Sequence, residues 1–179
     1  MKFIILISLA LFSQYLRAQN IKLSNAVVIT QFDKEEDRYA MQALMVDMLK
    51  SYQIKALPLM NVLKQGEAPQ HLLQDSIQKV LLQKGFDTYL VVNVRGYDRT
   101  FKPSDDTQTL AELLETTSIY HIYREEATSV SFEFSIYKGG QLISRQVLRC
   151  SNVSDRDSVL KRMRKRLPKK IIPSWTAWI

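Results

Sequence analysis

The sequence has few of the residue types from which cross-links and metal sites are built. It contains one cysteine, Cys150, and two histidines, His71 and His121. A single cysteine excludes an internal disulfide, so packing of the core must hold the domain together. The histidines have no metal-ligand spacing with each other or with Cys150. We therefore expect no metal site.

Motifs that carry catalysis or bind nucleotides are also missing. The sequence has no GxGxxG and no P-loop pattern. A serine or cysteine nucleophile needs a base and an oxyanion site arranged around it, and the sequence offers little of either. Two acidic pairs, at 105–106 and 125–126, lie in polar segments, where carboxylates are usually solvated. We expect no catalytic residue and no cofactor.

The first 18 residues have the order of a secretory signal peptide. Lys2 is followed by an apolar run over residues 3–12 and by a polar segment that ends at Ala18. The apolar run is far below the roughly 20 residues that a membrane-spanning helix needs. We expect cleavage after Ala18, a mature chain that starts at Gln19, and a periplasmic or secreted location in a bacterium. No cysteine lies near the cut, so we expect no lipid anchor and no transmembrane segment after cleavage.

Residues 19–179 have the length and composition of one globular domain. Hydrophobic residues make up 46% of the sequence and charged residues 24%, which is typical of globular proteins and argues against disorder. No long linker divides the chain.

The first half predicts three strands joined by two helices. Residues 25–32 form a β-branched run, and Asp33 with Glu36 resembles a capping box at the start of a helix. An apolar stripe at Met41, Leu44, Met45, Met48 and Tyr52 then has helical spacing and predicts core packing. A second strand over 54–57 ends at Pro58, a second helix carries Leu73, Ile77, Val80 and Leu81 and ends at Gly85, and residues 88–94 form a buried third strand.

The second half predicts a loop, a hairpin and a last helix. Residues 97–106 indicate a loop, and residues 107–123 a short helix at Leu110, Leu113 and Leu114 that changes to a strand at Ile119. Alternation over 129–136 predicts a strand with one solvated face. A Gly139–Gly140 turn leads back along 142–150, which places Ile136 opposite Ile143, Phe132 opposite Val147, and Ser129 opposite Cys150. Ser154 or Asp155 caps a helix that Pro168 stops.

These elements predict an α/β fold with a mixed sheet in two or three layers. The order is β-α-β-α-β, then a β-hairpin, then a C-terminal helix. Four segments carry a resemblance to known proteins: AVVITQF, LKSYQIKALP, KGFDTYLVVNVRGYD and SFEFSIYKGGQLISRQ.

The chain resembles a group of small envelope domains. The group comprises the amino-terminal domain of the Tol translocation β-propeller protein, the curli-secretion lipoprotein, and the lipoprotein activators of penicillin-binding proteins. The resemblance covers most of residues 25–150, although this chain has no lipobox cysteine and no β-propeller follows. It implies an accessory role in which the domain binds other envelope proteins.

A basic segment near the C-terminus is the strongest candidate binding feature. Residues 161–170 (KRMRKRLPKK) hold seven basic residues in ten. Because we expect export, we expect no nucleic acid partner and favour anionic lipid or an acidic protein face. A merely solvated helix face explains the same pattern. The candidate partner-binding residues are Lys161, Arg162, Arg164, Lys165, Arg166, Trp175 and Trp178, and the tryptophans either cover the core or anchor at an interface.

Three hypotheses about function follow from the sequence. The first is an exported, non-catalytic accessory module that binds an envelope protein or an anionic envelope surface. The second is a small exported hydrolase, which requires polar groups converging in a pocket near His121 or Cys150. The third is a structural domain that self-associates as a homo-oligomer.

Overall fold

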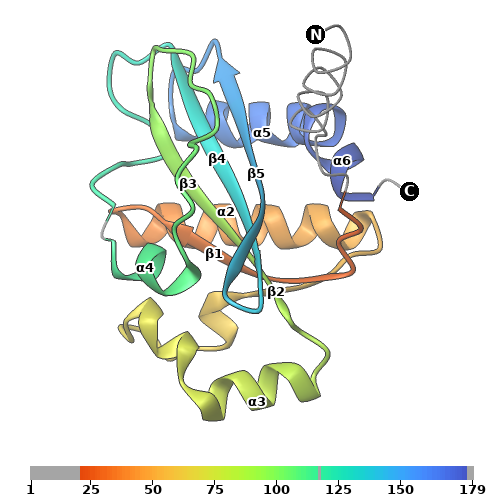
Figure 1. Cartoon of the computed structure of the whole chain (residues 1–179). Helices are drawn as coiled ribbons and strands as arrows, with labels where there is room; N and C mark the ends of the chain where they lie inside the picture. Colours follow the sequence, from red (N-terminus) through yellow and green to blue (C-terminus); the bar gives the residue numbers. More distant parts are fainter. Residues whose placement is uncertain (1–20, 117, 177–179) are drawn as a thin grey trace, which may run out of the picture.

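The structure is a computed structural model that describes residues 21–116 and 118–176. The predicted signal peptide and Trp178 lie outside the described residues. The helices and strands follow the predicted order (Figure 1): β1 (Asn25–Gln31), α2 (Glu35–Ser51), β2 (Lys55–Pro58), the 3₁₀ helices η1 (Leu59–Asn61) and η2 (Pro69–Leu73), α3 (Asp75–Gln83), β3 (Thr88–Tyr97), α4 (Leu110–Glu115), β4 (Ser129–Lys138), β5 (Gln141–Ser151), α5 (Arg156–Lys170) and α6 (Ile172–Thr176).

The five strands form one mixed sheet, as predicted. Their order is β2-β1-β3-β4-β5. β1 is parallel to both of its neighbours, β2 and β3, whereas β4 is antiparallel to both of its neighbours, β3 and β5. The parallel pairs follow from the two helical crossovers, and the antiparallel pair β4–β5 follows from the tight turn between them.

Helices cover both faces of the sheet, so the fold has three layers. On one face, α2, α5 and α6 pack on the strands around a core that includes Met45, Phe132 and Trp175. On the other face, η1, η2, α3 and α4 enclose a second core that includes Leu72 and Tyr137. Successive strand residues alternate between the two cores, because side chains in a strand point to opposite faces.

Helix α2 confirms the predicted apolar stripe but not its predicted start. Met41, Leu44, Met45 and Met48 are buried, whereas Tyr52 lies beyond the helix end and is 40% exposed. The predicted cap at Asp33 is wrong, because α2 starts at Glu35 and its N-cap residue Lys34 makes no side-chain cap. Asp33 is held elsewhere: its N–H donates to the Tyr120 carbonyl, 3.0 Å away.

Two smaller expectations about helix and strand boundaries are also wrong. Val80 of α3 is 46% exposed, since Leu81 is the residue that the helix buries, and Leu73 belongs to η2 because α3 starts only at Asp75. The short helix α4 confirms the leucine pattern at Leu110. However, Ile119 is 78% exposed and lies outside the strands, since its segment crosses the protein surface without a neighbouring strand to pair with.

The hairpin has the predicted turn, but its register differs by one residue. Gly139 and Gly140 have φ values of 57° and 79°, as a tight turn requires. Tyr137 lies opposite Leu142, and yet the next pair is Ile136 with Ser144. The chain therefore holds an extra residue, Ile143, in β5, and this β-bulge shifts all later pairs, so that Phe132 faces Leu148, Val130 faces Cys150 and Ser129 faces Ser151.

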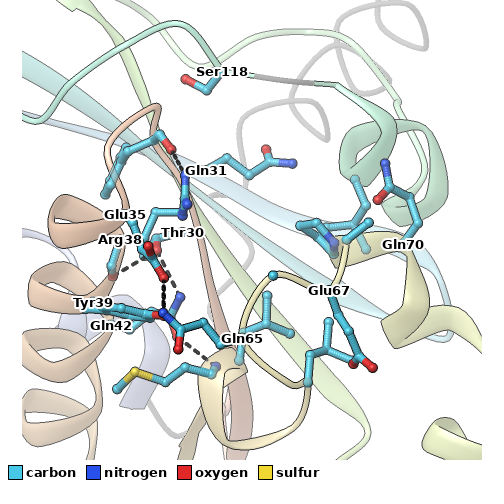
Figure 2. A pocket seen from close by; sticks show the side chains of 18 of the residues that line it. Thr30, Gln31, Glu35, Arg38, Tyr39, Gln42, Gln65, Glu67, Gln70 and Ser118 are labelled. Carbon is cyan, nitrogen blue, oxygen red and sulfur yellow. Dashed lines mark hydrogen bonds between the residues drawn. The ribbon is translucent and has the colours of Figure 1, made fainter.

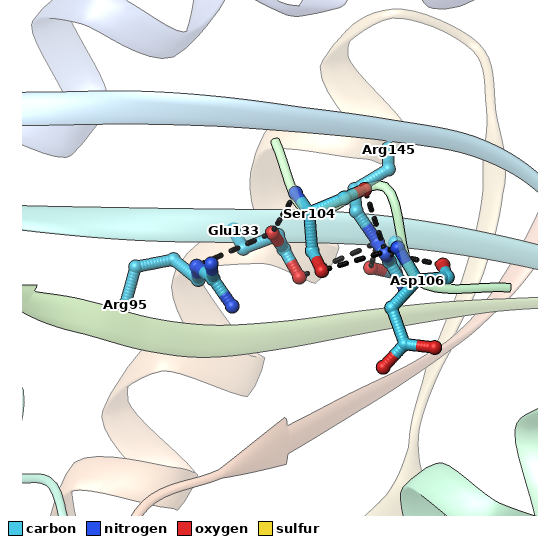
Figure 3. A network of polar contacts seen from close by, with 6 residues as sticks. Arg95, Ser104, Asp106, Glu133 and Arg145 are labelled. Carbon is cyan, nitrogen blue, oxygen red and sulfur yellow. Dashed lines mark hydrogen bonds and ion pairs between the residues drawn. The ribbon is translucent and has the colours of Figure 1, made fainter. Parts of the chain in front are cut away.

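The polar face of β4 is buried rather than solvated. Glu133 is only 7% exposed, and Ser129, Ser131 and Ser135 are buried as well. The loop between β3 and α4 crosses this face, and its backbone satisfies the polar groups beneath it (Figure 3): Ser104 N–H donates to Glu133, and Arg145 donates to the carbonyl oxygens of Ser104 and Asp106. Alternation in the sequence shows which face is polar, but only the tertiary structure shows what covers it.

Helix α5 starts as predicted and continues past its proline. Asp155 is the N-cap residue and forms a capping box with Ser158. The expected stop at Pro168 is wrong, since α5 runs to Lys170. A proline removes one backbone donor, but the Ile171 N–H still donates to the Leu167 carbonyl. Leu167 and Ile171 are both buried in the core, and this burial favours the helical turn that contains Pro168.

Candidate functional site

Helix α5 directs its basic side chains away from the core. Val159, Met163 and Leu167 are fully buried against the sheet and fix the orientation of the helix. Of the predicted binding residues, Lys161, Arg164 and Lys165 are exposed, and Arg162 and Arg166 are partly buried at the flanks of the apolar stripe. The structure thus brings these five residues together on one helix surface, which we call the basic face together with Lys169 and Lys170.

The basic face carries charge that the rest of the protein does not neutralise. α5 contains eight basic residues and one acidic residue, Asp157, so its formal charge of +7 equals the net charge of the whole chain. Arg156 pairs with Asp37 and Glu36, at 3.6 and 3.9 Å. The other seven basic residues have no ion pair with any carboxylate in the described part of the chain.

Trp175 lies in the core and is not part of this surface. Its side chain is 1% exposed and packs edge-on against Phe134, with ring centroids 5.9 Å apart. Of the two roles considered for this tryptophan, the structure shows the first, covering the core. Trp178 lies outside the described residues.

A pocket that the sequence did not predict lies at the carboxyl end of β1. It has a volume of about 670 Å³, within the range of small-molecule sites. Its walls come from the end of β1, the first turns of α2, residues 59–70 and the segment after α4 (Figure 2). In sheets with parallel strands, ligands bind beyond the carboxyl ends where neighbouring strands connect in opposite directions, and β1 lies at such a point, between β2 and β3.

Hydrogen bonds hold the pocket walls in place. The buried Gln42 joins α2 to both β1 and η1: its amide nitrogen donates to the Thr30 hydroxyl, 3.1 Å away, and its oxygen accepts from the Met60 N–H at 3.2 Å. The amide nitrogen of Gln31 donates to the Leu113 carbonyl, 2.8 Å away, and so ties β1 to α4. The sequence gives one sign of this pocket, namely Gln31, a polar residue at the end of an otherwise apolar strand.

Two charged side chains at the pocket, Arg38 and Glu35, form hydrogen bonds within the protein. Arg38 donates to the carbonyl oxygens of Phe32 and Asp33, at 2.7 and 2.9 Å. The Tyr39 hydroxyl and the Gln65 amide donate to the Glu35 carboxylate. These hydrogen bonds hold the pKa of Glu35 below its ordinary value, so this exposed carboxylate is ionised at neutral pH.

Cys150 and His121 do not converge on one pocket. Cys150 is buried beneath α5, and burial raises the pKa of its thiol to about 11, so the thiol stays protonated at neutral pH. The imidazole Nε2 of His121 lies 3.7 Å from the Asp33 carboxylate on the protein surface. Neither residue lines the pocket at the carboxyl end of β1, although Asp33 does, and the hydrolase hypothesis stays a prediction.

Within residues 21–116 and 118–176, histidine, cysteine and acidic side chains form no cluster of three that could hold a metal ion. In the same part of the chain, no helix has both the length and the apolar character needed to span a bilayer.

Comparison with known proteins finds similarity only among solved structures. No family model matches this chain, and no curated protein matches it. The chain is similar to the lipoprotein GNA1162 from Neisseria meningitidis, with 12% identity, coverage of 83% of this chain and 99% of that chain, and a TM-score of 0.44.

PelC from Paraburkholderia phytofirmans, crystallised as a dodecamer, is also similar. One PelC structure has 13% identity and a TM-score of 0.41, and another has 8% and 0.40; each alignment covers 82% of this chain and 87% of that chain. All three TM-scores lie below 0.5, so the likeness carries no conclusion about what this chain binds or does. The specific resemblance to the Tol, curli-secretion and activator domains stays a prediction.

Proposed function

We propose that this protein is an exported, non-catalytic accessory module of the bacterial envelope that docks on an anionic surface through the basic face of α5. The observation that carries the proposal is the concentration of unpaired positive charge on one rigid helix. The sequence pattern left open an ordinary solvated face, which predicts no binding to an anionic surface. Seven basic residues without an ion pair favour an external anionic partner instead.

Anionic lipid headgroups are the partner to test first. Each basic residue near an anionic membrane contributes about 1 kcal/mol of binding free energy. Replacing four of them should therefore weaken binding by about 4 kcal/mol, or roughly three orders of magnitude. Lys161, Arg164, Lys165 and Lys169 are the residues to change to glutamine, because all four are exposed and their loss leaves the core intact.

The experiment is co-sedimentation with vesicles of phosphatidylglycerol mixed with phosphatidylcholine, at low and at physiological salt. A matched control removes the same charge elsewhere, by changing Lys50, Lys79, Lys84 and Lys102 to glutamine; these residues are also exposed and unpaired in the described chain. We expect the control variant to bind the vesicles and the α5 variant not to bind them. Binding should also weaken at physiological salt, where the Debye length falls to about 8 Å.

Equal binding by the two variants would sink the proposal, because net charge alone would then explain the attraction. If the wild-type protein does not bind these vesicles but binds an acidic envelope protein, and this binding weakens with salt, the partner is an acidic protein surface and not lipid. Export itself is testable by fusing residues 1–24 to a reporter that is active only outside the cytoplasm.

Self-association is the second candidate function, and the open edge of β5 favours it. β5 has 11 residues and lies at the end of the sheet, so one side of its backbone is unpaired within the described chain. Sedimentation velocity over a concentration series tests this hypothesis directly. A monomer at all concentrations would remove it.

A further inference from the structure

The pocket at the carboxyl end of β1 has a second property: side-chain oxygens of Gln31, Gln65 and Glu35 in its wall can accept hydrogen bonds from a ligand. Gln31 is 8% exposed, and its amide nitrogen faces the carbonyl oxygens of Leu113 and Thr116. The amide nitrogen of Gln65 likewise faces the Glu35 carboxylate, 3.1 Å away. Because both nitrogens face acceptor oxygens, the orientation of each amide is fixed, and its carbonyl oxygen is left without a donor among the described residues.

Gln70 has a further acceptor without a partner, but this oxygen lies out of reach of a ligand. Its amide oxygen is inaccessible to water, and none of the described residues donates a hydrogen bond to it. A buried carbonyl oxygen without a donor costs free energy, so such groups need an explanation. Gln31 is the buried glutamine that a ligand can reach, and it lines the pocket together with Glu35 and Gln65 (Figure 2), so a ligand in the pocket can supply the missing donor.

The charges at the pocket disfavour an anionic ligand. Three carboxylates line it, those of Asp33, Glu35 and Glu67, against two basic residues, Arg38 and Lys64. Arg38 is already committed to backbone carbonyls. The start of α2 would ordinarily attract an anion, but Glu35, Glu36 and Asp37 fill its first turn.

We propose that this pocket binds a small organic primary amine, whose ammonium group donates to the free oxygens of Gln31 and Gln65 and to the Glu35 carboxylate. An ammonium group has three donors and no acceptor, which complements a set of free acceptors. The apolar side chains of Leu59, Met60 and Leu63 line the pocket as well and suit the carbon chain of such a ligand. This site lies on residues other than the basic face, so its test is independent of vesicle binding.

The probe is 1,4-diaminobutane, and titration calorimetry with the purified protein measures its affinity. Two controls match its length: 1,4-butanediol, which has hydroxyl groups in place of the amines, and succinate, which carries the opposite charge. Amide shifts in ¹H–¹⁵N spectra locate the bound ligand. We expect the diamine to shift residues 30–42 and 59–70, and neither control to do so.

Variants separate binding from structure. Glu35→Gln should weaken diamine binding roughly tenfold, since a charge-assisted hydrogen bond becomes a neutral one. Glu36→Gln removes a carboxylate from the same helical turn but outside the pocket, and should change the affinity less than about twofold. Gln65→Ala should weaken binding without lowering the melting temperature, because it removes an acceptor carried by an exposed side chain.

Several results would overturn the proposal. Equal affinity for the diol would make the pocket a site for neutral hydroxyl compounds, and succinate binding would reverse its charge preference. The absence of pocket shifts at saturating diamine would remove the site. If Gln65→Ala unfolds the protein, the Gln65 amide has a structural role, and the comparison of Glu35→Gln with Glu36→Gln then decides alone.

Discussion

Replacing Glu133 by glutamine should destabilise the protein far more than the loss of a surface charge does. The Glu133 carboxylate is buried between β4 and the loop that crosses it, 3.4 Å from Arg145 Nε and 3.5 Å from Arg95 Nε (Figure 3). It also accepts from the Ser104 N–H, 3.3 Å away. Arg145 is equally buried, so the substitution leaves its positive charge without a counter-charge in the interior.

The expected cost follows from this burial. Removing one partner of a buried ion pair costs about 3–5 kcal/mol. Because Arg145 keeps the carbonyl oxygens of Ser104 and Asp106 as acceptors, we expect the low end, about 3 kcal/mol. For a domain of this size, that corresponds to a melting temperature lowered by roughly 6–12 °C.

Urea unfolding followed by circular dichroism measures this loss. The matched control is Glu125→Gln, at an exposed carboxylate with no partner in the described chain, which should stay within about 0.5 kcal/mol of wild type. A double variant with Arg145→Gln should lose less than the sum of the single losses, because both substitutions break the same pair. If Glu133→Gln is as stable as Glu125→Gln, the buried pair does not hold the loop to the sheet.

Three further outcomes test other contacts. Asp155→Ala should lower stability by about 1 kcal/mol through loss of the α5 capping box, whereas Asp47→Ala, at an exposed carboxylate on α2, should not, as urea midpoints will show. A hydrogen bond from Asn25 and pairing with Lys138 lower the pKa of Asp87 from 3.8 to about 2, so its contribution is present above pH 4 and lost between pH 4 and 2; Asp87→Asn should flatten that part of the stability profile. Cys150 should resist iodoacetamide at pH 8 in the folded protein and react in urea, and rapid alkylation of native protein would contradict its burial.

Local patterns in the sequence determined the elements and their order. The β-branched runs at 25–31 and 88–94 are strands, the stripe that begins at Met41 is core, and the alternation from Ser129 with the two glycines is a hairpin. These features follow from side-chain periodicity and from backbone conformations that only some residues adopt, both of which act over a few residues. The basic segment after Asp155 was visible for the same reason, since its spacing places Met163 and Leu167 on one side.

Only the tertiary structure decided what each surface meets. The polar alternation of β4 is the same whether water or a loop covers it, so burial of Glu133 depends on where the chain returns after β3. The β-bulge at Ile143 leaves no mark in the hydrophobic pattern. It nevertheless changes the residue opposite Cys150 from the predicted Ser129 to Val130. The pocket requires Gln31, Glu35, Gln65 and Gln70, which come from three separate segments, to meet at one end of the sheet. Periodicity cannot predict such a site, because long-range packing sets the distances between its residues.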